Sequence, residues 1–283
     1  MRVKAMPVLV LAVAVGAGAL GMPAVAPGAG ADPDGPCACG GLERLEKSPR
    51  HQEWVEVKHG QRTVHTFVVY PEVKDKATAV IVIHENKGLT DWVRGVADQF
   101  AEAGYIALAP DLLSGLGPNG GKTSDFASPD KATQALYKLD PAQITADLNA
   151  VADYALKLPA GNGKITVAGF CWGGGQCFRF ATQRQDLRAA FVFYGSFAET
   201  REALAKIACP VYGFYGENDA RINATVPKSA ATMKELGKVY EPVTYSGAGH
   251  GFMRLGEDPK GSAANRKARA DSWERLRTIL KGI

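Results

Sequence analysis

The sequence predicts an α/β fold, in which a doubly wound and mostly parallel sheet carries helices on both faces. Short apolar runs alternate with segments whose apolar residues recur at helical spacing, the pattern of repeated strand–helix–strand units. The run 78–84 contains the uninterrupted apolar stretch Ala-Val-Ile-Val-Ile, as expected for a strand that is buried on both faces. Once an N-terminal leader is set aside, about 250 residues remain, which is the length of one such domain.

The first predicted element is an antiparallel hairpin at a sheet edge, with strands at 54–57 and 63–70 and a turn at His59 and Gly60. The later strands are expected at 78–84, 105–109, 165–168, 190–194, 211–215 and 239–245. Pro242 lies inside the last of these runs and has no N–H to donate. That strand is therefore expected at an edge of the sheet.

Helices are predicted between these strands and after them. The first contains Val93 and Phe100 on its apolar face and ends at Gly104. A second begins with Asp140 as its N-cap and Pro141 at its first helical position. The last contains Trp273 among its apolar residues. In a sheet built from such units, ligands and chemistry are expected at the carboxyl ends of the strands.

The N-terminus has the features of an export signal. Arg2 and Lys4 precede an apolar run over 7–20, and small-x-small cleavage candidates lie at 24–26 and 29–31. The run is short for a bilayer span, although a retained anchor helix is the alternative interpretation. We therefore expect residues 1–31 to be a secretion signal peptide, residues 32–50 a flexible N-terminal segment and residues 51–283 a single domain. The protein would be periplasmic or secreted, without stable membrane association after the signal is removed.

Composition excludes some partners. The chain has 33 lysines and arginines against 29 acidic residues and no basic stripe with interleaved aromatics, so no nucleic-acid partner is expected. It has neither His-Glu-x-x-His nor Cys-x-x-Cys, and we expect no metal and no other cofactor. We expect a monomer. Glycine-rich patterns at 115–120 and 121–123 resemble nucleotide-binding motifs but lack the required context, and are interpreted as a flexible surface loop near the active-site mouth.

The most informative motif is Gly-Phe-Cys-Trp-Gly-Gly over residues 169–174, directly after the predicted strand 165–168. It has the spacing of a nucleophile elbow, G-x-S-x-G, with Cys171 in place of serine. Such an elbow is a sharp turn from a buried strand into a helix. The dipole and free N–H groups of the helix N-terminus favour the thiolate form of a cysteine placed there.

Partners for Cys171 follow in the order that a nucleophile elbow requires, acid first and histidine second. Asp219 comes at the end of the strand 211–215, and His250 lies in a glycine-rich loop after the strand 239–245. The other four histidines precede the elbow. Glu217 is the alternative to Asp219 as the acid, and Asp219 could instead cap a turn.

These motifs resemble the dienelactone hydrolase family of α/β-hydrolases. The matching pieces lie at 84–88 (His-Glu-Asn-Lys-Gly), 104–112, the elbow, 218–219 and 249–254, so that the likeness runs from about residue 50 to the C-terminus. The resemblance implies an α/β-hydrolase fold and a carboxylic ester hydrolase similar to carboxymethylenebutenolidase.

The resemblance also implies roles for single residues. Glu85 would contact Cys171 and assist thiolate formation, and Arg254 would bind a substrate carboxylate. A second family arginine is expected before Tyr137, where this chain has Lys131, Thr133 and Gln134. The fold expectation adds an oxyanion hole formed by the backbone N–H groups of Trp172 and Asn86. The predicted partner is a small-molecule ester or lactone, cleaved by a Cys171–His250–Asp219 triad through a thioester.

Two other functions use the same features. Cys171 could be a redox or sensing thiol, although no resolving cysteine lies near it in the sequence. The chain could also be a non-catalytic ligand-binding module on the same fold. Cys177 and Cys209 are expected to be small buried hydrophobes. Cys37 and Cys39 are too close together for a comfortable disulfide with each other, and their pairing is open.

Overall fold

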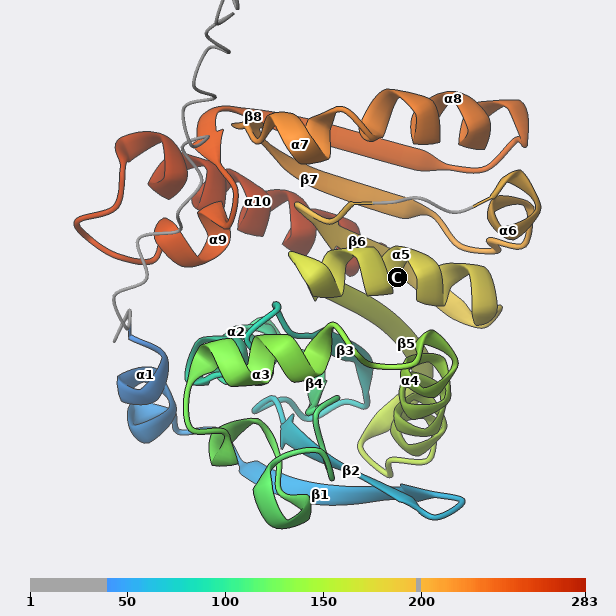
Figure 1. Ribbon diagram of the computed structural model, residues 1–283. Helices are drawn as coiled ribbons and strands as arrows, with labels where there is room; N and C mark the ends of the chain where they lie inside the picture. The colour runs from blue at the N-terminus through green and yellow to red at the C-terminus, as the bar shows by residue number, and fades with distance from the viewer. Residues whose placement is uncertain (1–39, 197–199) are drawn as a thin grey trace, which may run out of the picture. The chain divides into compact units, whose positions relative to one another are not determined.

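The computed structural model describes residues 40–196 and 200–283, which include all the predicted strands and helices (Figure 1). The predicted signal peptide, Cys37 and Cys39 lie outside the described residues, and the expectations about them stay predictions. Among the described residues, no helix combines the length and the apolar character needed to cross a bilayer.

An eight-stranded sheet forms the centre of the fold, with strand order β1-β2-β4-β3-β5-β6-β7-β8. The strands are β1 (Gln52–His59), β2 (Arg62–Val69), β3 (Ala77–Ile83), β4 (Ile106–Pro110), β5 (Gly161–Phe170), β6 (Leu187–Phe193), β7 (Val211–Asn218) and β8 (Tyr240–Gly249). β1 pairs antiparallel with β2, and β2 antiparallel with β4, while all other neighbours are parallel. The predicted doubly wound, mostly parallel sheet is confirmed.

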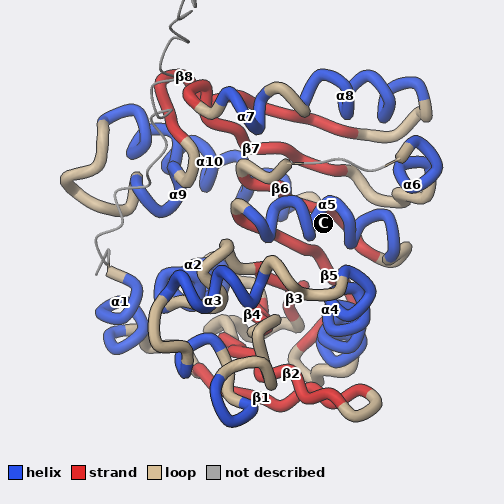
Figure 2. Tube along the Cα trace, in the orientation of Figure 1, coloured by secondary structure: helices blue, strands red, loops and turns tan. Residues whose placement is uncertain are grey.

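Helices cover both faces of this sheet, as Figure 2 shows in blue around the red strands. They are α1 (Gly41–Lys47), α2 (Asp91–Glu102), α3 (Pro129–Leu136), α4 (Pro141–Leu156), α5 (Trp172–Gln183), α6 (Arg201–Ala205), α7 (Ala220–Asn223), α8 (Val226–Glu235), α9 (Phe252–Leu255) and α10 (Ala263–Lys281). One apolar core contains residues of α4, α5, α6 and α8, and a second contains residues of α1, α2, α9 and α10. Two cores separated by a sheet explain why its central strands are apolar throughout.

Several local predictions are confirmed. β1 and β2 form the expected edge hairpin, and β8, which contains Pro242, is the opposite edge of the sheet. The carboxylate of Asp140 accepts a hydrogen bond from the N–H of Ala142 at 2.8 Å, as an N-cap does at the start of α4. Gly104 has φ +97°, a conformation that favours glycine and ends α2.

The expectation that residues 32–50 are a flexible segment is wrong for its second half. Residues 41–47 form α1, and Leu45 is buried in the core beside α2. The carboxylate of Asp98 on α2, fully buried, accepts hydrogen bonds from the guanidinium groups of Arg44 and Arg50 at 2.7–2.8 Å. A buried carboxylate is costly without such partners, so this cluster fixes the segment to the domain.

The glycine-rich loop after β4 is expected near the active-site mouth. In the structure, its glycines do not line the cavity beside Cys171. The hydroxyl of Thr123 donates to Asp111 at 2.7 Å and accepts from the N–H of Leu89 at 3.1 Å, which anchors the loop. Gly115 and Gly120 line a separate cavity with Arg62, beside the β1–β2 hairpin.

Candidate active site

Cys171 lies in the sharp turn between β5 and α5 and has φ 55° and ψ −116°. A non-glycine residue with positive φ is strained, and such strain occurs where a side chain must be held in one place. The turn also needs small neighbours. A Cβ added to Gly173 would collide with the carbonyl groups of Ile83 and His84, and one added to Gly169 would collide with the carbonyl of Gly173. The predicted elbow conformation is therefore present.

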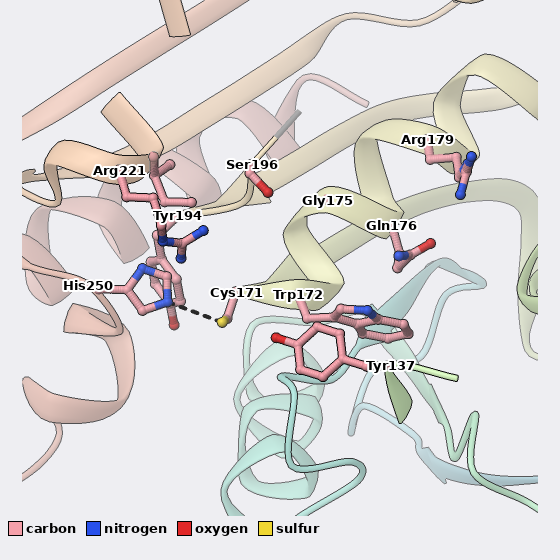
Figure 3. Close-up of a pocket in the computed structure, with 11 residues that line it drawn as sticks. Tyr137, Cys171, Trp172, Gly175, Gln176, Arg179, Tyr194, Ser196, Arg221 and His250 are labelled. Carbon is pink, nitrogen blue, oxygen red and sulfur yellow. Dashed lines mark hydrogen bonds between the residues drawn. The ribbon is translucent and has the colours of Figure 1, made fainter. Parts of the chain in front are cut away.

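A chain of two hydrogen bonds leads away from the Cys171 thiol, and Figure 3 shows the first of them, to His250. Cys171 Sγ lies 3.1 Å from Nε2 of His250, and Nδ1 of the same ring lies 2.6 Å from Oδ2 of Asp219. Cys171 follows β5, Asp219 follows β7 and His250 follows β8, so the three side chains meet at the carboxyl ends of parallel strands. The structure thus brings together the three residues that the sequence order indicated.

The environment of His250 favours its charged form. Burial alone would lower its pKa, but hydrogen bonds to Asp219 and Cys171, with their negative charge, outweigh burial and raise the pKa of His250 to about 10. The edge of the ring also faces Tyr194, with ring centroids 5.1 Å apart. An imidazole held between a carboxylate and a sulfur is suited to exchange a proton with that sulfur.

Asp219 and Glu217 differ clearly in position. Asp219 is buried, pairs with His250 and caps α7 through the N–H of Ile222. Glu217 is exposed, and its carboxylate accepts hydrogen bonds from the N–H of Gly247 at 2.7 Å and the hydroxyl of Ser246 at 3.0 Å. Only Asp219 of the two is within hydrogen-bond distance of His250.

Glu85 is buried two residues after the end of β3, and its carboxylate contacts different groups from those expected. The Tyr194 hydroxyl donates to Oε1 at 3.3 Å, and Nε of Arg254 donates to Oε2 at 3.2 Å. Among the described residues, Glu85 makes no hydrogen bond to Cys171, in contrast to the contact that the resemblance implied. Burial raises the pKa of Glu85, and the positive charges of Arg254 and His250 act against that shift.

The two predicted oxyanion donors lie in adjacent turns. Trp172 is the first residue of α5, and Asn86 lies in the turn after β3. Neither backbone N–H donates to another described residue. His84 holds the two turns together: its Nδ1 hydrogen-bonds to the carbonyl of Glu85 at 2.8 Å, and its ring stacks on the Trp172 indole with centroids 5.6 Å apart. This arrangement leaves both N–H groups available to a developing negative charge.

A cavity of about 260 Å³ opens beside the thiol (Figure 3). It is lined by Tyr137, Cys171, Trp172, Gly175, Gln176, Arg179, Tyr194, Ser196, Arg221, Ile222 and His250. Arg254, the predicted substrate contact, is not among the lining residues. Among the described residues, no three His, Cys, Asp or Glu side chains are grouped so that they could hold a metal ion.

The sequence analysis missed Gln176, Arg179 and Arg221. A signal for Gln176 and Arg179 was present, because they lie four and seven residues after Trp172, the first residue of α5, and these positions share one face of a helix. Arg221 had no such signal. It depends on the turn that α7 makes after Asp219, which the sequence pattern did not indicate.

The fold and the position of this cavity define the class of the protein. A mostly parallel sheet of eight strands, with a strained turn between a central strand and its helix, is the architecture of the α/β-hydrolases. Residues 64–283 match the sequence profile of the dienelactone hydrolase family, and the chain belongs to that family. It is therefore a hydrolase.

Individual relatives agree with this assignment. A protein of Saccharolobus solfataricus, provisionally named a carboxymethylenebutenolidase, is 30% identical over 249 residues, 78% of this chain and 94% of the relative. A Bradyrhizobium protein named a probable 2-oxo-3-(5-oxofuran-2-ylidene)propanoate lactonase is 25% identical over 71% of this chain and 83% of its own. A crystal structure of a provisionally named dienelactone hydrolase from Klebsiella pneumoniae has a TM-score of 0.72 at 23% identity, covering 83% of this chain and 99% of that one. At this identity, the structural likeness supports the fold.

Proposed function

We propose that this protein hydrolyses ester or lactone bonds of small molecules, with Cys171 as nucleophile, His250 as general base and Asp219 as the acid that orients His250. The observation that carries the proposal is the hydrogen-bonded chain from the Cys171 sulfur through both nitrogens of His250 to Asp219. Nucleophile, base and orienting carboxylate within hydrogen-bond distance of one another are the requirements of this chemistry.

In the first half of the reaction, Nε2 of His250 takes the thiol proton and the Cys171 sulfur attacks the substrate carbonyl carbon. The carbonyl oxygen becomes an oxyanion, for which the N–H groups of Trp172 and Asn86 are the proposed donors. The carbon–oxygen bond to the leaving group then breaks, and His250 returns its proton to the departing oxygen. A thioester remains on Cys171.

In the second half, His250 takes a proton from water as the water oxygen attacks the thioester carbon. The carbon–sulfur bond breaks, the acid product leaves and the proton returns to the Cys171–His250 pair. A thiolate is itself a good leaving group and can be expelled again from the first tetrahedral intermediate. The reaction goes forward only when the substrate's own leaving group departs at least as readily as the Cys171 thiolate. Activated esters and enol lactones meet that condition, and amides do not.

Two relatives support a lactone as one substrate class, because the name of one is carboxymethylenebutenolidase and that of the other is a lactonase. Glu85 is a candidate positioning residue rather than a direct partner of the thiol, since it connects Tyr194 and Arg254 behind the site. Removing it would act on the reaction through those two side chains.

An activated aryl ester tests the proposal, with Cys171→Ala compared against Cys177→Ala. Cys177 is fully buried six residues further along the same helix, and the two changes remove the same atoms. We expect Cys171→Ala to abolish turnover and Cys177→Ala to keep most of it. Mass spectrometry of the wild type, quenched during turnover, should find the acyl group on the peptide that contains Cys171.

Other outcomes would reject the proposal in distinct ways. Equal loss in both cysteine variants would mean that Cys171 is not the nucleophile. A wild-type protein without esterase or lactonase activity, but with a readily oxidised Cys171, would favour a thiol redox or sensing function instead.

A further inference from the structure

We propose that His84 is a positioning residue for the reaction, and that its ring orients the backbone N–H of Asn86 toward the oxyanion that forms on the substrate. This inference rests on the proposed function and adds a side chain to its oxyanion hole. His84 is fully buried, does not line the cavity and lies outside the hydrogen-bonded chain that starts at Cys171.

The hydrogen bonds of the His84 ring define its protonation state. Nδ1 lies 2.8 Å from the carbonyl oxygen of Glu85, and Nε2 lies 3.3 Å from the backbone nitrogen of Leu112. A carbonyl oxygen can only accept and a backbone N–H can only donate, so Nδ1 carries a proton and Nε2 carries none. Burial lowers the pKa of His84, and the negative charge of Asp111 only partly opposes that shift. The ring is therefore a neutral imidazole in a single tautomer.

The hydrogen bond from Nδ1 acts on the peptide group that contains the Asn86 N–H. The carbonyl that accepts it belongs to Glu85 and shares a planar, trans peptide unit with the nitrogen of Asn86. In such a unit the C=O and N–H bonds point in opposite directions. A donor that holds the oxygen on the His84 side therefore turns the N–H away from His84. The same hydrogen bond polarises the peptide unit and makes its N–H a stronger donor.

The turn that contains this peptide has a second, local hydrogen bond. The Glu85 carbonyl also accepts from the N–H of Gly88 at 3.2 Å, which closes the turn. That bond lies within the turn, whereas the His84 ring connects the turn to Leu112 in the loop after β4. Loss of the imidazole would leave the turn closed but without this connection. We therefore expect a partial loss of function rather than a complete one.

The ring of His84 also contacts the other proposed donor. It stacks on the Trp172 indole with ring planes 12° apart, and Trp172 begins α5 directly after Cys171 (Figure 3). The backbones are equally close, because a Cβ added to Gly173 would lie 2.4 Å from the carbonyl oxygen of His84. One residue thus contacts both turns that carry the proposed oxyanion donors, which fixes the two N–H groups relative to each other.

Substitution by leucine and by glutamine separates the hydrogen bonds from the bulk of the side chain. Leucine fills space without polar atoms, whereas glutamine keeps a donor and an acceptor that are spaced like the two nitrogens of an imidazole. On an activated aryl ester, we expect His84→Leu to lower kcat by about tenfold to a hundredfold with little change in KM, because the oxyanion charge develops only in the transition state. His84→Gln should recover most of that loss.

His59→Leu is the matched control. The His59 ring is also partly buried, and its Nε2 lies 2.7 Å from the carboxylate of Asp147 beside the β1–β2 hairpin. His59 does not line the cavity beside Cys171. The same substitution at this position should lower the stability of the fold and leave kcat within about twofold of wild type.

Two reagents distinguish positioning of the oxyanion donors from general damage to the site. Iodoacetamide alkylates the Cys171 sulfur by displacing iodide and forms no oxyanion. A trifluoromethyl ketone accepts the same sulfur at its carbonyl carbon, and the carbonyl electron pair becomes an oxyanion. In His84→Leu, the alkylation rate should stay within about threefold of wild type. The dissociation constant of the ketone, measured by fluorine NMR, should rise by the factor by which kcat/KM falls.

A measurement on the wild type decides the question if His84→Leu does not fold. Nitrogen NMR of the histidine rings, with His84 assigned by the signals that disappear in His84→Gln, reports which ring nitrogens carry protons. We expect a neutral ring protonated at Nδ1 at every pH at which the protein stays folded. An imidazolium, or a ring protonated at Nε2, would overturn the inference.

The outcomes separate this inference from the proposed function. If the wild type hydrolyses no ester but its affinity for the ketone depends on His84, the hydrolase proposal fails and the inference stands. If esters are hydrolysed and a folded His84→Leu changes neither kcat nor the affinity for the ketone, the hydrolase stands and the inference is wrong. Equal losses of turnover and of alkylation would also overturn it, because His84 would then act on the triad or on the fold.

Discussion

Glu85 is a carboxylate at the end of a strand that is buried on both faces, where ionisation is unfavourable. Among the described residues, its carboxylate accepts two side-chain hydrogen bonds, from Tyr194 and Arg254, which offset part of the cost of burial. Burial is the larger influence and raises the pKa of Glu85. A glutamate at this position therefore reduces the stability of the fold at neutral pH, as is common for residues retained for function.

The first prediction concerns the pH dependence of that cost. Because the folded-state pKa of Glu85 lies above its unfolded value, its contribution to stability is complete below the unfolded pKa and is lost as the pH rises through the folded pKa. The melting temperature of the wild type minus that of Glu85→Gln should therefore fall as the pH rises from 4 to 8. Calorimetry across that range measures it.

The pKa of Glu217 is shifted in the opposite direction from that of Glu85, so the two residues can be compared. The hydrogen bonds from Gly247 and Ser246 lower its pKa, so its stabilising contribution is present at neutral pH and is lost towards acid pH. The difference between wild type and Glu217→Gln should rise with pH. If the melting-temperature differences for Glu85→Gln and Glu217→Gln changed with pH in the same direction, burial would not be the dominant influence on the pKa of Glu85.

At the scale of elements, the segment from β7 into α7 illustrates what a sequence pattern can and cannot predict. The apolar run and the Asn-Asp pair placed Asp219 at a strand end, because strand period and turn residues are local properties. The pattern left Glu217 as an alternative acid, because the choice depends on which carboxylate faces a loop 31 residues away. Arg221 was missed for the same reason.

The prediction at this scale separates the two carboxylates that follow β7. Asp219→Asn should lower kcat/KM on an activated ester on the order of a hundredfold or more, because the amide no longer holds His250 in the required tautomer. Glu217→Gln should stay within about threefold of wild type, since the described partners of the Glu217 carboxylate are Ser246 and Gly247 and do not include His250. The reverse ranking in steady-state kinetics would transfer the acid role to Glu217.

At the scale of the whole domain, the sequence predicted the sheet and missed the attachment of the N-terminal segment. Apolar composition in the sequence predicts the strands, and the glycines on either side of Cys171 predict the elbow. The helix α1 depends instead on a buried carboxylate at Asp98, roughly 50 positions further along the chain, which accepts hydrogen bonds from Arg44, Ser48 and Arg50. Burial acts against ionisation of Asp98, but these partners outweigh it and hold its pKa below the usual value.

The attachment is testable by Asp98→Asn. Removing the charge leaves guanidinium groups without their buried partner, and we expect a loss of about 3 kcal/mol in the free energy of unfolding. Chemical denaturation measures that loss, and limited proteolysis should release the segment around α1 first. Asp153→Asn is the control, because Asp153 pairs with Arg184 at an exposed site and should change stability by less than about 1 kcal/mol. Equal effects would mean that Asp98 does not fix the segment.

The position of β8 at the edge of the sheet has a consequence for how activity would be lost. His250 follows this strand, which has one neighbour in the sheet, whereas Cys171 follows β5 in the interior. Local opening of a folded protein begins where protection is lowest, and edge elements are less protected than central ones. Detachment of the end of β8 would separate the imidazole from the sulfur while most of the sheet stayed folded. We therefore expect heating to inactivate this protein through partial opening at the end of β8, at temperatures below those that unfold the core.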